Sequence, residues 1–138
     1  MYKFEKEMPI SAKECFDALI DIAILEVERK TGKVITRDEV MKGYKYLSKR
    51  KVGRNIIDAK VHIKKPEPDH RFHTSYSFDN RTIEMDYLIT ALDDTHMKLV
   101  YTQDNGNEEI KGLQKFLMNR DMKKKCKGIA KYVLSKKN

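Results

Sequence analysis

The chain has little of what disulfide scaffolds and structural zinc sites require, because only two of its 138 residues are cysteines. Cys15 and Cys126 lie far apart in the sequence, and neither has a second cysteine nearby. This pattern excludes a small secreted disulfide scaffold and a zinc knuckle. Both cysteines fall on apolar stripes of predicted helices, so we expect two free, buried thiols.

Long apolar runs are also missing, since no segment approaches the roughly 20 apolar residues of a transmembrane helix. The N-terminal residues alternate apolar and charged side chains, whereas a signal peptide has a continuous apolar core. The second residue is Tyr2 rather than the glycine of a myristoylation signal. The low glycine and proline counts and the lack of a repeat exclude collagen and repeat arrays. We therefore expect a cytoplasmic protein.

The composition is that of a folded protein, with 40% hydrophobic and 9% aromatic residues. A chain of this length buries about two-thirds of the surface that its unfolded form exposes, which allows a core without disulfides. We therefore expect a single domain spanning residues 1–138.

Basic residues outnumber acidic ones by 29 to 21, which gives a formal net charge of +8. The charge is uneven, because residues 42–65 carry nine basic and one acidic residue and residues 120–138 carry eight and one. Residues 79–109, by contrast, carry two basic and eight acidic residues. Two interpretations of these basic segments are open: they form a solvated face, or they form a surface that binds polyanions.

The first quarter of the chain predicts a strand followed by two helices. Residues 2–8 alternate apolar and polar side chains, which is typical of a half-buried strand. Ser11 with Glu14, and Thr36 with Glu39, have the spacing of capping boxes that begin helices. The first helix should bury one stripe, and Gly32 is expected to end it. That stripe consists of Phe16, Leu19, Ile20, Ala23 and Val27.

Alternation then returns in five more segments, separated by turns that contain Pro66, Asp79-Asn80 and Asp93-Asp94. Short strands joined by short turns predict an antiparallel meander with one apolar, aromatic face. The alternating segments are residues 44–49, 57–64, 72–78, 83–90 and 97–102.

The last part of the chain predicts a helix from about Glu108 to near Ser135. Gly112 and Gly128 each cost about 1 kcal/mol inside a helix relative to alanine. Close packing on the sheet would offset this cost, or Gly112 marks a kink. The helix carries an apolar stripe of Met118, Met122, Cys126, Ile129 and Val133.

This order of elements resembles the START and Bet v 1-like (SRPBCC) helix-grip superfamily. The stretch from Met8 to Leu19 is the most specific part, because it resembles the strand-to-helix junction of such domains. Residues 31–37, 43–46 and 123–125 make the chain similar to a bacterial family, domain of unknown function 3284, which implies no activity here. The resemblance implies an α+β fold, with a curved antiparallel sheet, two N-terminal helices and a long C-terminal helix. It also implies a hydrophobic cavity between the sheet and that last helix. The alternation predicts about six strands, whereas the fuller helix-grip pattern has seven.

No residue pattern predicts a metal site, a cofactor or catalysis. His62 and His73 fall on the polar face of the sheet, without the spacing of helical or paired metal ligands. Glu84 and Asp86 lie on the same charged face, where solvated carboxylates are expected. No nucleophile and base stand out as a pair, and no phosphate-binding loop is present.

The apolar face of the sheet carries several tyrosines, whose hydroxyls need partners when buried. In a filled interior the hydroxyls would form hydrogen bonds with one another. In an apolar pocket they would instead orient a ligand. The predicted lining residues are Tyr46, Thr74, Tyr76, Met85, Tyr87, Tyr101, Leu117 and Met122.

The leading hypothesis is a ligand-binding module for a hydrophobic or amphipathic small molecule, held between the sheet and the C-terminal helix. The alternative is a protein that binds nucleic acid or an acidic membrane surface, and an enzyme of the cyclase or hydrolase type is the third hypothesis. The residues assigned to polyanion binding are Lys49, Arg50, Lys51, Arg54, Lys123, Lys124, Lys125 and Lys127.

Overall fold

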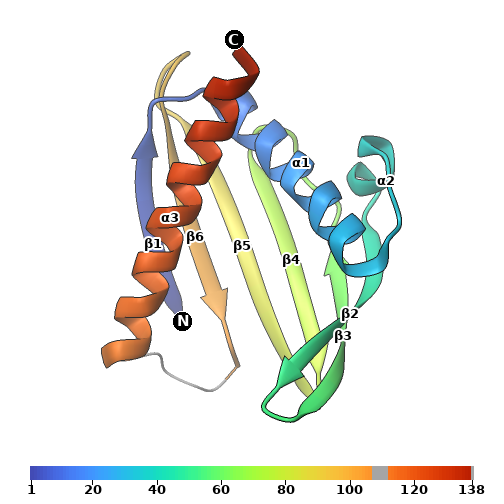
Figure 1. The fold of residues 1–138 in the computed structure, drawn as a ribbon. Helices are drawn as coiled ribbons and strands as arrows, with labels where there is room; N and C mark the ends of the chain where they lie inside the picture. The colour runs from blue at the N-terminus through green and yellow to red at the C-terminus, as the bar shows by residue number, and fades with distance from the viewer. Residues whose placement is uncertain (107–111, 138) are drawn as a thin grey trace.

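A computed structural model describes residues 1–106 and 112–137, apart from the side chains of residues 50–52. Its sheet has six antiparallel strands in the spatial order β1-β6-β5-β4-β3-β2, which confirms the predicted meander (Figure 1). The turn between β4 and β5 contains Asp79 and Asn80, both with positive φ. The strands are β1 (Tyr2–Met8), β2 (Tyr44–Val52), β3 (Asn55–Ile63), β4 (Arg71–Phe78), β5 (Arg81–Ala91) and β6 (Met97–Asp104).

Three helices, α1 (Ala12–Thr31), α2 (Arg37–Met41) and α3 (Gly112–Lys137), accompany the sheet. Both capping boxes form, with the Ser11 and Thr36 side chains accepting from the backbone N–H groups of Glu14 and Glu39. Gly32 ends α1 in the left-handed conformation. Together these elements are the predicted α+β helix-grip arrangement, in which α1 and α3 cover one face of the sheet (Figure 1).

The glycines of the last helix behave differently from the prediction. Gly112 has a φ of 62° at the first position of α3, so it does not produce a kink inside the helix. At Gly128 an added Cβ would have no neighbouring atom within 4 Å, so close packing on the sheet is wrong as an explanation. The predicted start near Glu108 lies outside the described residues, and the helix extends to Lys137, close to the predicted end near Ser135.

The concave face of β1 and β6 lies under α3, and we call this region the filled half (Figure 1). The rings of Tyr2 and Tyr101 meet edge to face there at 6.2 Å, and the Tyr2 hydroxyl donates to Asn119 Oδ1 of α3 at 2.6 Å. Met122 and Ile129 of α3 are buried in the same hydrophobic cluster. Side chains therefore occupy most of the space between α3 and these two strands, and a groove of about 250 Å³ remains between β1 and α3, lined by residues that include Met8 and Ala130.

The two cysteines lie in this cluster as buried free thiols, as predicted. Burial raises the pKa of the Cys15 thiol to about 12, so it is protonated and unreactive at neutral pH.

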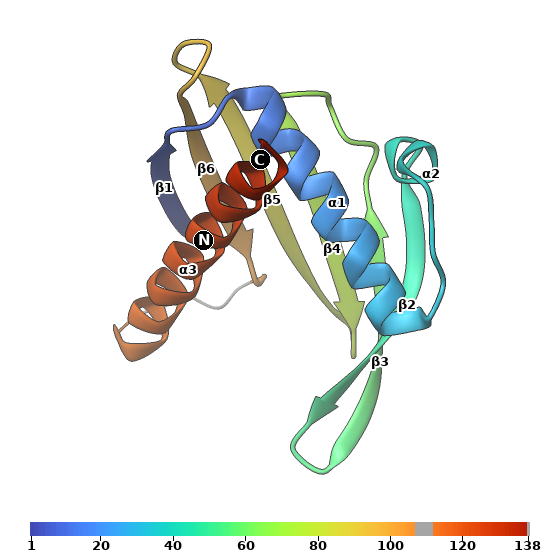
Figure 2. The ribbon, with the colours of Figure 1, turned by 45° about the horizontal axis from the view of Figure 1, so that its top comes forward.

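The helices α1 and α3 are joined at one end and diverge toward the other (Figures 1 and 2). At the joined end Asp21 of α1 accepts hydrogen bonds from Tyr132 at 2.7 Å and from Lys136 at 2.6 Å. Lys137 pairs with Glu14 nearby at 2.8 Å. Because the helices separate from there, α3 does not cover the concave face of β3 and β4. The hairpin of β2 and β3 extends beyond both helices (Figure 2).

Candidate ligand pocket

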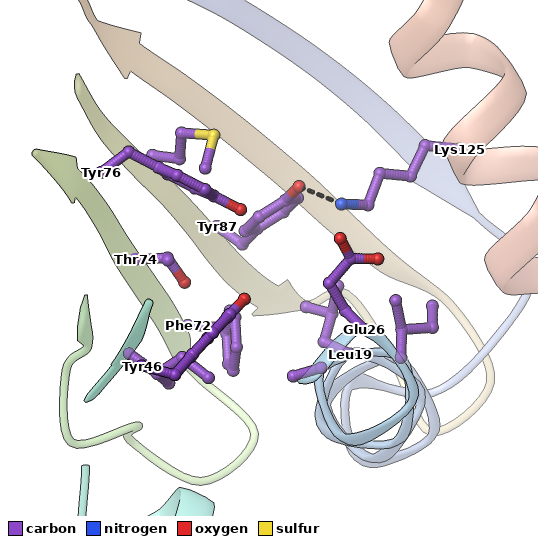
Figure 3. Close-up of a pocket in the computed structure, with 12 residues that line it drawn as sticks. Leu19, Glu26, Tyr46, Phe72, Thr74, Tyr76, Tyr87 and Lys125 are labelled. Atoms are coloured by element: carbon purple, nitrogen blue, oxygen red, sulfur yellow. Dashed lines mark hydrogen bonds between the residues drawn. The ribbon is translucent and has the colours of Figure 1, made fainter. Parts of the chain in front are cut away.

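A cavity of about 290 Å³ occupies the space where the helices diverge (Figure 3). We call this region, between α1, the concave face of β2 to β5 and one residue of α3, the hollow half. Its walls are mostly apolar and aromatic, and polar groups of several elements face the same space. The lining residues are Leu19, Ile22, Ala23, Glu26, Tyr46, Ile63, Phe72, Thr74, Tyr76, Met85, Tyr87 and Lys125.

Among the lining residues that the structure describes, Lys125 is the one that α3 supplies, and its amino group points into the cavity (Figure 3). Nζ donates a hydrogen bond to the Tyr87 hydroxyl and lies 4.7 Å from the centre of the Tyr87 ring. Burial lowers the pKa of Lys125 below its ordinary value, because a desolvated ammonium group is costly. Burial likewise raises the pKa of Tyr87, so its phenol stays neutral.

Glu26 of α1 is the acidic side chain of the lining, and its carboxylate lies on the same side of the cavity as the Lys125 amino group (Figure 3). Its carboxylate accepts from Arg29 Nη2 at 2.5 Å, next to it on the exposed surface of α1. Among the described residues, no ion pair within 4 Å joins Lys125 to a carboxylate. The ammonium group of the pocket is therefore held by a neutral phenol and its ring.

Five of the eight predicted lining residues lie in this cavity, and they are Tyr46, Thr74, Tyr76, Met85 and Tyr87. Tyr101 does not line it, because its ring packs against Tyr2 and Tyr87 in the filled half and its hydroxyl donates to Gln103 at 2.6 Å. Met122 is buried under α3, and Leu117 lies toward the N-terminal end of that helix. The prediction that the cavity lies between the sheet and α3 was wrong, since α1 supplies most of the helical wall.

The α1 residues of the wall could have been found from their spacing. Leu19, Ile22, Ala23 and Glu26 follow the i, i+3, i+4, i+7 pattern of one helix face, beside the buried stripe of Phe16. The apolar face of α1 is therefore wider than packing against the core alone requires. The extra width indicates that part of this face borders another space, here the cavity.

The residues assigned to polyanion binding do not form one surface. Lys123, Lys124 and Lys127 are exposed on α3, which packs against β1, one edge of the sheet. Lys49 and Arg54 are exposed on the β2–β3 hairpin at the opposite edge, and the side chains of Arg50 and Lys51 lie outside the described residues.

Lys125, which was also assigned to polyanion binding, is half-buried and does not lie with the exposed lysines of this helix. It precedes the buried Cys126 and follows Met122 by three residues, which places it at the border of the buried stripe.

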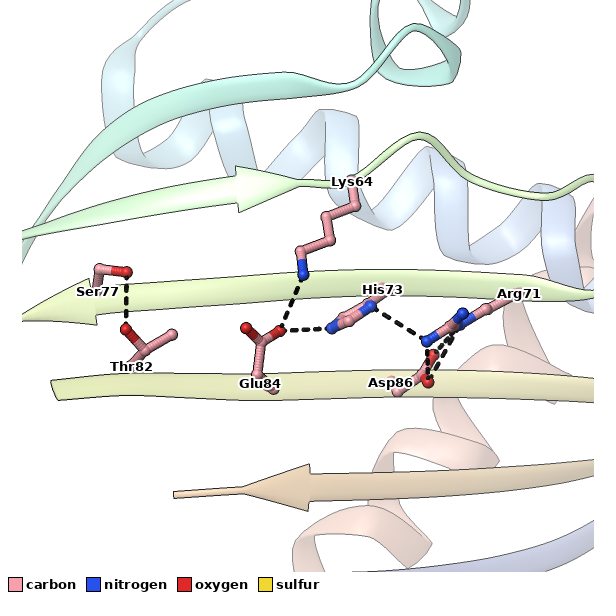
Figure 4. Close-up of polar contacts among 7 residues, drawn as sticks. All are labelled: Lys64, Arg71, His73, Ser77, Thr82, Glu84 and Asp86. Atoms are coloured by element: carbon pink, nitrogen blue, oxygen red, sulfur yellow. Dashed lines mark hydrogen bonds and ion pairs between the residues drawn. The ribbon is translucent and has the colours of Figure 1, made fainter. Parts of the chain in front are cut away.

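The outer face of the sheet carries a row of ion pairs rather than isolated, solvated carboxylates (Figure 4). Arg71 binds the Asp86 carboxylate through Nε at 2.9 Å and Nη2 at 2.8 Å. His73 Nε2 lies 2.5 Å from Glu84, which also pairs with Lys64 at 3.5 Å. These contacts explain the charged side chains of β4 and β5 as cross-strand pairs.

A larger depression of about 410 Å³ lies on this outer face, over residues that include Leu47, His62 and Ser75. In the described part of the chain no second layer encloses it, since both long helices lie on the other face (Figure 1). Within residues 1–106 and 112–137 no cluster of three histidine, cysteine or acidic side chains could hold a metal ion. None of the helices described is long and apolar enough to cross a membrane.

A family model for domain of unknown function 3284 (DUF3284) matches residues 2–120, which is most of the chain. The chain belongs to the DUF3284 family. The match includes all six strands and α1, whereas Lys125 lies beyond its end. No curated protein matches this DUF3284 chain significantly.

Several solved structures share the START and Bet v 1-like fold of this DUF3284 member. TTHA0849 from Thermus thermophilus is 14% identical, with a TM-score of 0.59 and 99% of each chain covered. The Zhui aromatase/cyclase from Streptomyces sp. R1128 is 10% identical, with a TM-score of 0.56, over 97% of this chain and 90% of that one. DynU16, from the dynemicin biosynthetic locus, is 12% identical with a TM-score of 0.61, and the 96% of this chain that aligns spans 46% of its length. At these identities the likeness concerns the fold.

Proposed function

We propose that this DUF3284 protein is a small ligand-binding module that holds an amphipathic molecule in the hollow half. The observation that carries the proposal is the cavity itself, which combines apolar walls with a few converging polar groups. Small-molecule sites usually have this composition, and about 300 Å³ is the lower end of their volumes. One protein with this fold is named an aromatase/cyclase, and this name supports a small molecule as the partner of the present chain.

The volume limits the size of the ligand. An engineered cavity of about 150 Å³ in another protein binds benzene, so a cavity of about 290 Å³ suits a two-ring aromatic or a short-chain molecule. The rings of Tyr46, Phe72, Tyr76 and Tyr87 in the wall offer faces for aromatic stacking. The ligand would gain affinity from burial of its apolar body, and the hydroxyls would orient it.

The test uses 1-naphthylamine, a two-ring dye that is uncharged at neutral pH and whose fluorescence changes in apolar surroundings. We expect saturable binding by the native protein and a loss of affinity of about tenfold or more in A23F, because the new ring occupies the cavity. The matched control is L25F, since Leu25 is exposed on the same helix. No saturable uptake by the native protein, or equal uptake by A23F, would overturn the proposal.

A polyanion-binding surface is the second candidate, favoured by the exposed Lys123, Lys124 and Lys127. Its affinity for nucleic acid or anionic vesicles should fall steeply with salt and should decrease in a triple variant of these lysines to glutamine. Binding no tighter than that of an unrelated protein of equal charge would remove this candidate.

A further inference from the structure

The chemistry at one end of the hollow half narrows the ligand class, and this step rests on the proposed function. We infer that Lys125 binds the carboxylate of a small aromatic or short-chain acid, whose apolar body fills the rest of the cavity. Three observations lead there: the position of Nζ, the charges around it and the free energy of its desolvation.

The position of Nζ leaves donors available to a ligand. A protonated lysine has three N–H donors, and one of them is used on the Tyr87 hydroxyl. The side chain is half-buried and lines the cavity, so the other donors are next to the space that a ligand would occupy (Figure 3). The Tyr87 ring and hydroxyl hold Nζ in place before any ligand arrives.

The charges around Nζ favour an anion. Tyr87, its hydrogen-bond partner, is a neutral phenol, and no described carboxylate lies within ion-pair distance of Nζ. Glu26 lies on the same side of the cavity as Nζ, and its carboxylate also pairs with Arg29 on the exposed side of α1. These three charged side chains together carry a net positive charge, which a ligand carboxylate would balance.

The free energy of the pairing also favours a ligand acid. An ion pair formed by two solvated groups loses much of its benefit to desolvation. Lys125 is half-buried and already partly desolvated in the folded protein, so folding has met part of that cost and the ligand's carboxylate bears most of the rest. Charge-assisted hydrogen bonds of this kind are about twice as strong as neutral ones.

The test compares naphthoic acid with naphthalenemethanol, which have the same ring system and differ in the carboxylate. We expect the native protein to bind the acid about tenfold more tightly or better. K125M should lose that preference while its affinity for the alcohol stays within about threefold. The matched control is K124M, which removes an equal charge from an exposed neighbour and should keep the preference.

The outcomes separate the two proposals. Binding of the alcohol with no preference for the acid would overturn the role of Lys125 and leave the pocket as the ligand site. Binding of neither compound would overturn both. Equal losses for acid and alcohol in K125M would show a structural role for the lysine, and alcohol binding by K125M itself reports a folded pocket.

The pH dependence offers a second readout. The groups that face Lys125 are Glu26 from α1, Tyr76 from β4, Tyr87 from β5 and Cys126 from α3 itself. Since only the ammonium form attracts a carboxylate, affinity for naphthoic acid should fall as the pH rises, and at a lower pH than the one at which a solvated lysine loses its proton. Affinity of the native protein for the alcohol should stay constant over this range, and a constant affinity for the acid would count against the inference.

Discussion

The filled half and the hollow half of the concave face are built from the same kind of strand, yet only one of them encloses the described cavity. Tyr101 on β6 and Tyr87 on β5 are direct cross-strand neighbours with ring centroids 4.8 Å apart. On the Tyr101 side the ring and hydroxyl find partners within the protein, whereas on the Tyr87 side the hydroxyl meets Lys125 at the cavity. An aromatic apolar face therefore does not by itself predict a pocket, because the distance between the sheet and the covering helix determines whether side chains fill the space.

The largest expected difference between the halves concerns truncation. Ile129→Ala should lower the free energy of unfolding by about 2 to 5 kcal/mol, since Ile129 is fully buried and the change leaves a new cavity. Met85→Ala should cost less than about 1.5 kcal/mol, because Met85 is half-buried and already borders open space. Urea unfolding measures both, and equal costs would break the comparison.

Enlargement of a side chain should separate the halves in the same order. Cys15→Leu should destabilise the protein by about 1 to 3 kcal/mol, because Cys15 is fully buried and extra atoms force its neighbours apart. Ala23→Leu, on the same helix, should change stability by less than about 0.5 kcal/mol, since the added atoms enter the cavity. Thermal unfolding of the two variants checks this, and a larger loss for Ala23→Leu would mean that the cavity is closed in solution.

The joined end of α1 and α3 should depend on pH through Asp21. Burial by itself raises the pKa of Asp21, but the hydrogen bonds from Lys136 and Tyr132 outweigh it and lower the pKa below its ordinary value. The carboxylate therefore contributes stability at neutral pH, which is lost as the pH falls below about 4 and through the lowered pKa. Asp21→Asn should cost about 1 kcal/mol at pH 7 and progressively less in acid, measured by urea unfolding across pH.

The control for that series is Glu28→Gln, an exposed carboxylate on the same helix. It should change stability by less than about 0.5 kcal/mol at any pH. A destabilisation by Asp21→Asn that persists unchanged in acid would show that the ion pair does not join the helices.

Removal of the Tyr101 hydroxyl in the filled half should have a small effect on stability and none on binding. Tyr101→Phe should cost about 1 kcal/mol, because it removes the hydrogen bond to Gln103 and leaves the ring in place. It should leave the binding of 1-naphthylamine unchanged, since Tyr101 does not line the cavity. Stability and dye titration together check this, and a large loss of binding would place Tyr101 at the ligand site.

Much of the fold could be predicted from the sequence, because the decisive signals are local. The capping boxes at Ser11 and Thr36 involve residues three positions apart, and the structure forms both. The alternation of the strands assigned each side chain to a face, and the buried Met97, Leu99 and Tyr101 confirm it for β6. These features depend on backbone geometry and neighbouring residues, which the sequence states directly.

The position of the pocket could not be predicted in the same way. The apolar stripe of α3 correctly predicted a helix on the sheet, but only the tertiary structure determines that it covers β1 and β6 and leaves β4 open. The orientation of Lys125 could not be predicted either, since a lysine at the border of a buried stripe can extend toward solvent or toward the interior. Its direction depends on whether an acceptor such as Tyr87, 38 positions earlier in the chain, lies within reach.

The sequence by itself therefore determined the elements, their order and the face that each strand buries, because those follow from periods of two and 3.6 residues. The tertiary structure decided which part of the apolar face is filled and which is hollow. The physical reason is the divergence of α1 and α3 from their contact at Asp21, which depends on residues far apart in the chain and brings Lys125 to the cavity.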